Sequence, residues 1–194
     1  METLQVLKRA LSAAAEVLSF GAGIQKDARE RLIADLHSIC GKCEDAYGTV
    51  LLRLRPVKKA FGDPQLLASE LLDLSTDQST RDSFKPEHLC GEVDNLLDAL
   101  ANNLDALKYA VDWNRITAIK EGIRNIGNFD AAIFASYDQF ARNLEGISTQ
   151  LTDPSEDSME RVAYARRVIT EFEKELRDAI DGVRQCKDLV LRSE

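Results

Sequence analysis

The sequence predicts an all-α protein: an elongated antiparallel bundle of four long helices with about two shorter ones, forming a single domain over residues 1–194. Apolar residues recur three and four positions apart along most of the chain, which is the pattern of one buried helix face. Glycine and proline are scarce, with 10 and 4 copies, and residues that favour helices dominate. The breaks between the apolar stripes are short, which favours antiparallel neighbours.

The first half of the chain contains three expected helices. One runs from Glu2 to Phe20, where two glycines follow. A long second helix begins near Lys26, and Pro56 within it predicts a kink or a stop just before the proline. Its apolar stripe comprises Leu32, Leu36, Ile39, Cys43, Ala46, Val50, Leu54 and Val57. Asp63 and Pro64 predict the start of a short helix through Leu74, because an acidic cap before proline suits a first turn.

The second half begins with the polar stretch Ser75–Lys85, which we interpret as a loop. Helix resumes at Pro86, and the pattern leaves open whether the segment Pro86–Ile126 is one continuous helix. The next stripe extends from Ile133 to Leu151 and is broken by an Asp-Pro pair. The last helix is expected over Ser158–Leu191.

The composition of the chain argues against some classes of function. The formal net charge is −8, so the average surface repels phosphate backbones and we expect no general nucleic-acid binding. Four cysteines indicate reduced thiols and a cytoplasmic location. The pattern predicts no transmembrane segment, and no cofactor motif is found.

The N-terminal segment resembles a signal peptide in its order of charge and apolar residues, since Lys8 and Arg9 precede the apolar stretch Ala10–Ile24. Glu16 interrupts that stretch, which favours an amphipathic helix. An alternative function follows from this helix: a membrane-acting bundle that releases Leu4–Ile24 for insertion.

Cysteine and histidine side chains suggest a metal alternative. Cys40 and Cys43 form a CxxC pair that follows His37, and His88 with Cys90 would complete a zinc site. The CxxC pair falls on the apolar stripe of its helix, and cysteine is among the most buried residue types. Our main interpretation is therefore that both cysteines are core residues and that no metal is bound.

A catalytic alternative rests on Arg31 and His37, an arginine followed by a histidine after five intervening residues. This pair resembles the active-site motif of HEPN-domain ribonucleases, which are also helical. The resemblance implies a metal-independent ribonuclease in which the two residues promote attack of a ribose hydroxyl on its phosphate. On an ideal helix, however, the two side chains project about 120° apart.

The strongest local charge anomaly is the basic segment Arg53–Lys59, which contains four cations in an otherwise acidic chain: Arg53, Arg55, Lys58 and Lys59. Such a segment could bind an acidic or phosphate-bearing partner, or it could stabilise the end of its helix. Trp113 lies with Tyr109 and Phe129 near an expected helix break, where aromatic residues can anchor a partner.

No nucleotide-binding or nucleophile motif is found, so the leading hypothesis is a non-enzymatic protein-interaction or regulatory module, a subunit or adaptor of a larger assembly. The expected partner is another protein, bound through the basic segment and Trp113. The sequence is also compatible with a homo-oligomer.

Overall fold

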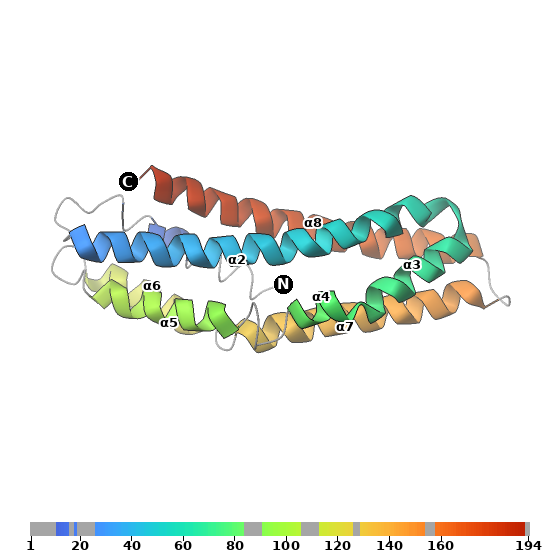
Figure 1. Cartoon of the computed structure of the whole chain (residues 1–194), viewed down its shortest axis with the longest axis horizontal. Coiled ribbons are helices and arrows are strands. Elements are labelled where there is room, and N and C mark those ends of the chain that lie inside the picture. The colour runs from blue at the N-terminus through green and yellow to red at the C-terminus, as the bar shows by residue number, and fades with distance from the viewer. Residues whose placement is uncertain are drawn as a thin grey trace.

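The structure is a computed structural model of the chain, and it describes residues 11–15, 18, 26–83, 91–105, 113–125, 129–153 and 158–192. The chain forms an elongated bundle of helices, as expected from the sequence (Figure 1). Its longest helices are α2 (Lys26–Lys59), α7 (Phe129–Thr152) and α8 (Ser158–Leu191). The predicted all-α antiparallel bundle is therefore confirmed.

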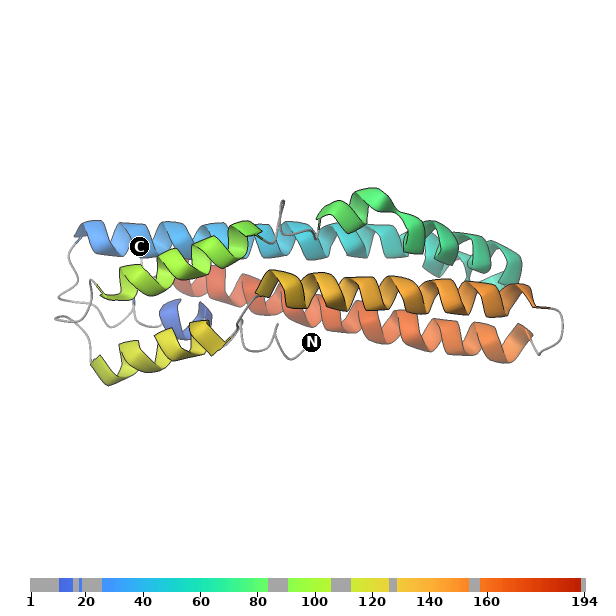
Figure 2. The same ribbon diagram turned by 90° about the horizontal axis from the view of Figure 1, so that it is seen from below.

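Helices α2 and α8 run side by side in opposite directions along most of the bundle (Figure 1). At the end where α2 finishes, α3 (Pro64–Thr76) packs on α7. At the end where α2 begins, α5 (Gly91–Asp105) packs on α2, and α6 (Trp113–Asn125) packs on α5 (Figure 2). The bundle thus has different helices beside the α2/α8 pair at its two ends.

The buried stripe of α2 is the one that the sequence predicts. All eight of its members lie in the hydrophobic core: Leu32, Leu36, Ile39, Cys43, Ala46, Val50, Leu54 and Val57. At about 1.5 Å per residue, the 34 residues of α2 span about 50 Å. A single stripe over that length lets α2 contact α5 near its start, α3 near its end, and α8 from about Glu44 to Lys58.

Of the two outcomes predicted at Pro56, a kink or a stop just before it, the stop does not occur, because α2 continues through Pro56 to Lys59. A proline inside a helix removes one backbone hydrogen bond and costs about 3 kcal/mol. Pro56 is exposed, whereas Leu54 and Val57 on either side of it are fully buried. Burial of these neighbours offsets the cost and keeps the last turn helical.

The prediction of a polar loop over Ser75–Lys85 is also wrong in part. Helix α3 extends to Thr76, and a short helix, α4 (Gln78–Ser83), follows at once. Asp77 starts it: its carboxylate accepts hydrogen bonds from the Ser79 amide at 3.1 Å and the Thr80 hydroxyl at 2.6 Å. The predicted cap of α3 is confirmed, since Asp63 accepts from the amides of Gln65 and Leu66.

The segment Pro86–Ile126 is not one continuous helix. Helices α5 and α6 pack against each other, which two parts of one straight helix cannot do. Of the N-terminal helix, residues 11–15 and 18 are described; they are helical, and Leu11 and Leu18 are fully buried in the core. In the described part of the chain, no helix combines the length and the apolar character needed to cross a bilayer.

Candidate functional site

The basic segment Arg53–Lys59 forms the last two turns of α2, but its four cations do not act together. Arg53 pairs with Asp77, at 3.1 Å, and so ties α2 to the junction of α3 and α4. Lys58 pairs with Glu173 of α8 at 2.6 Å. These two cations hold neighbouring elements in place, which is the stabilising role that the sequence left open.

Arg55 and Lys59 are the other two cations of the segment. Both are exposed, one helical turn apart, and no salt bridge among the described residues includes either of them. Both line a groove between α2 and α8, which we call the α2/α8 groove. Half of the predicted partner-binding cations are therefore available at one surface.

The α2/α8 groove has a volume of about 820 Å³ and a mixed, mainly basic lining. Five cations border it against three carboxylates: Arg55, Lys58, Lys59, Arg177 and Arg184 against Glu44, Asp45 and Glu173. The groove thus carries an excess of two positive charges, on a chain whose formal net charge is −8. It is a local departure from the charge of the whole molecule.

Ion pairs across the groove fix its walls. Glu44 of α2 accepts from Arg184 at 2.9 Å and from Lys187 at 2.6 Å, both on α8. These hydrogen bonds, from Lys187 first and then Arg184, lower the pKa of Glu44. At the other end of the groove, hydrogen bonds from Lys58 and then Arg177 lower the pKa of Glu173. Both carboxylates therefore stay ionised at neutral pH, and ion pairs join α2 to α8 at both ends of the groove.

The floor of the groove has apolar and open positions between these charged ends. Leu52 is 55% exposed and gives the groove an apolar surface. One turn earlier, a Cβ atom built on Gly48 would meet nothing within 4 Å. The groove can therefore admit a closely packed chain segment with an apolar contact at Leu52.

The sequence analysis did not predict that residues of α8 and of the middle of α2 line the groove together with the basic segment. Arg177 and Arg184 lie seven residues apart and away from the apolar stripe of α8, so they share one face. Asp45, Leu52 and Lys59 are spaced by seven as well. This second heptad series on the outer side of α2 is the signal that could have located the groove.

Trp113 does not belong to the groove. It begins α6, at the end of the bundle where α2 starts, whereas the basic segment is at the far end of α2 (Figure 2). Its side chain is 50% exposed. Tyr109 lies outside the described residues, and so does the side chain of Phe129, so the predicted aromatic cluster is represented by Trp113 alone.

The catalytic alternative places both of its residues in the first half of α2. Arg31 is exposed, and His37 is half-buried with its Nε2 atom buried. Neither residue lines the α2/α8 groove. The ribonuclease activity stays a prediction.

The cysteines of the CxxC pair are buried in the core, with Cys40 0% and Cys43 2% exposed. The neighbouring Cys186 thiol of α8 and burial together raise the pKa of the Cys40 thiol. Within the described ranges, no group of three or more His, Cys, Asp or Glu side chains could hold a metal ion. His88 and Cys90, the other members of the zinc alternative, lie outside those ranges.

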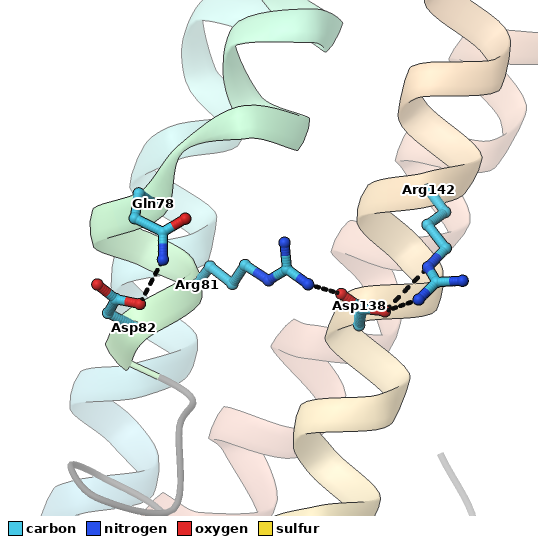
Figure 3. Close-up of polar contacts among 5 residues, drawn as sticks. All are labelled: Gln78, Arg81, Asp82, Asp138 and Arg142. Carbon is cyan, nitrogen blue, oxygen red and sulfur yellow. Dashed lines mark hydrogen bonds and ion pairs between the residues drawn. The ribbon is translucent and has the colours of Figure 1, made fainter.

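A second charged cluster joins α4 to α7 and was not predicted. Asp138 of α7 lies between Arg81 of α4 and Arg142 of its own helix, and pairs with both (Figure 3). Next to it, burial and the charge of Asp77 raise the pKa of Tyr137 to about 12. Since these carboxylates and cations satisfy one another, the cluster holds α4 in place.

Comparison of the chain with known protein families, curated proteins and solved structures found no match. The fold defines the class of the protein: an all-α bundle whose two longest helices, α2 and α8, border a charged surface groove.

Proposed function

We propose that the protein is a non-enzymatic interaction module that binds an acidic helical segment of a partner protein in the α2/α8 groove. The observation that carries this proposal is the placement of Arg55 and Lys59. They are exposed at one wall of a groove with an excess of cations, on a chain that is acidic overall.

The shape of the groove favours a helix over a compact anion. The α2 residues that line it extend from Glu44 to Lys59, which is about 22 Å of helix at about 1.5 Å per residue. On the opposite wall, Arg177 and Arg184 lie about 10 Å apart along α8. Both arginines also pair with carboxylates of the groove, Glu173 and Glu44. A groove of this length with charges spread along it fits an elongated segment, whereas a single phosphate is bound by donors that converge on it.

The apolar contact adds specificity to the charge. A helix in a groove is recognised by apolar anchors on one face and by charges at the rim. Leu52 supplies the apolar surface in the middle of the groove, and the open space over Gly48 allows close approach. The expected partner segment therefore has an apolar centre and acidic residues toward Arg55 and Lys59.

Binding of a synthetic amphipathic helix with acidic flanks and a leucine centre tests the proposal, with fluorescence anisotropy as the measurement. We expect the double variant Arg55→Glu/Lys59→Glu to weaken binding by about tenfold or more, because close charge pairs across an interface contribute on the order of 1.4 kcal/mol or more. Binding should also weaken as salt rises.

A matched control carries the same change of charge away from the groove. Arg124 and Lys174 are exposed and do not line it, so Arg124→Glu/Lys174→Glu should bind the peptide nearly as the unmodified chain does. Equal losses in both double variants would show that only net charge matters, and absence of binding to the unmodified chain would refute the proposal.

A further inference from the structure

The outer face of α2 carries one row of residues with the spacing of a single helix face. Its positions alternate at intervals of four and three residues: Gly41, Asp45, Gly48, Leu52, Arg55 and Lys59. The last five of these line the α2/α8 groove. The inner, buried stripe of α2 is therefore accompanied by a second stripe that faces outward.

This outer stripe is self-complementary about Val50. Asp45 and Arg55 lie five residues before and after it, and Gly48 and Leu52 lie two residues before and after it. Asp45 and Arg55 are both exposed, and no salt bridge among the described residues includes either. A two-fold axis that runs between two antiparallel copies of α2, at the level of Val50, would place each of these residues opposite its complement.

We propose that the occupant of the α2/α8 groove is α2 of a second copy of this chain, antiparallel to the first, in a symmetric dimer. The inference rests on the proposed function, because it names the partner for the same groove. Asp45 pairs with Arg55 of the partner subunit, and the symmetry repeats this pair on the other side of the axis. The helix that the groove accepts is thus the chain's own α2, whose Asp45 supplies the carboxylate opposite Arg55.

The apolar contact follows the same symmetry. Leu52, 55% exposed in the chain alone, lies over Gly48 of the partner subunit, where the space above the helix is open. Each copy therefore contributes one protruding side chain and one depression, which is the knobs-into-holes relation of packed helices.

Charge reversal tests the pairing, with sedimentation velocity over a wide range of protein concentrations as the measurement. We expect the unmodified chain to dimerise. In Asp45→Arg, the new arginine faces Arg55 of the partner subunit, on both sides of the axis. In Arg55→Asp, the new carboxylate faces Asp45 of the partner subunit in the same way. Because like charges then face each other, each variant alone should have a dimer dissociation constant about tenfold or more higher. An equimolar mixture of the two variants restores both opposite-charge pairs and should form a heterodimer.

Filling the depression tests the packing. Gly48→Leu should block dimerisation while the chain stays folded, because the added side chain projects into open space. Gly146→Leu is the matched control, since Gly146 also lies in a long helix with nothing within 4 Å of its Cβ position, but outside the groove. Circular dichroism of both variants verifies that the fold is intact.

The outcomes separate this inference from the proposed function. A chain that stays monomeric but binds the acidic peptide would overturn the dimer and leave the proposed function standing. A dimer insensitive to Asp45→Arg and Gly48→Leu would show that the chain associates through another face, which also overturns the inference. A chain that neither dimerises nor binds the peptide would refute both.

Discussion

Glu44 and Lys187 are 143 residues apart in the sequence and form a hydrogen-bonded ion pair of 2.6 Å between α2 and α8. Arg184 adds a second cation to the same carboxylate. The three side chains are partly exposed, so solvent screens the pair, but the carboxylate is held from two sides. This junction fixes the register between the two longest helices and forms one end of the α2/α8 groove.

Replacing Glu44 by glutamine should lower the free energy of unfolding by about 1 kcal/mol, because one carboxylate loses two cationic partners. Urea unfolding followed by circular dichroism measures it. Asp181→Asn is the matched control: it removes a 3.9 Å contact to Arg184 in which both side chains are more than half exposed, and should have almost no effect. Equal effects in the two variants would contradict the role of Glu44.

Acid should destabilise the protein through three carboxylates whose pKa values are lowered on folding. Hydrogen bonds from cations lower the pKa of Glu44 and Glu173; for Asp77, burial acts in the opposite direction, but the Thr80 hydrogen bond and the charge of Arg53 outweigh it. A lowered folded-state pKa gives stability that is present above the unfolded value and is lost as pH falls toward the folded value.

The melting temperature should therefore be nearly constant around neutral pH and fall below about pH 4.5, the ordinary value for glutamate. The double variant Glu44→Gln/Glu173→Gln should melt lower at neutral pH and show a shallower decline in acid. Parallel melting curves for the two proteins would mean that these carboxylates do not carry the pH dependence.

Much of the fold could be predicted from the sequence because burial follows helical periodicity. The apolar stripe of α2 and the cap at Asp63 are where the sequence places them. The helix over Gln78–Ser83 could not be predicted by composition, since it has no apolar stripe and depends on the Asp77 cap and on contacts with α2 and α7. Contacts with other helices therefore stabilise α4, whose own sequence has little tendency to form a helix.

The basic segment shows why the candidate site was predicted only in part. Its four cations are adjacent in sequence, but side chains one or two positions apart on a helix point in different directions. The partners of Arg53 and Lys58 are Asp77 and Glu173, which lie on other elements. No reading of the segment alone could show which cations were already paired.

The pairing of Arg81 with Asp138 should hold α4 against α7 (Figure 3). In Asp138→Ala, Arg81 and Arg142 lose their shared acceptor, and α4 has only six residues and few other contacts. We expect faster hydrogen exchange at the α4 amides, measured by mass spectrometry, with little change in α2 and α8. Gln78→Ala, which removes only a contact within α4, is the control; similar exchange in both variants would contradict this role of Asp138.

The four cations of the basic segment should separate into two classes when each is replaced by alanine. Arg53 and Lys58 pair with acids on other elements, so Arg53→Ala and Lys58→Ala should each lower the free energy of unfolding by up to about 1 kcal/mol after solvent screening. Arg55→Ala and Lys59→Ala remove exposed side chains that border the groove and should change stability by less than about 0.5 kcal/mol.

Binding of the acidic peptide should follow the opposite order. Arg55→Ala and Lys59→Ala should weaken it, because these cations face the groove, whereas Arg53→Ala should leave it nearly unchanged, because Arg53 does not line the groove. Urea unfolding and peptide anisotropy on the same four variants measure both properties. If all four lose stability and none loses affinity, the segment serves only to stabilise the end of α2, and the binding site must be sought elsewhere on the bundle.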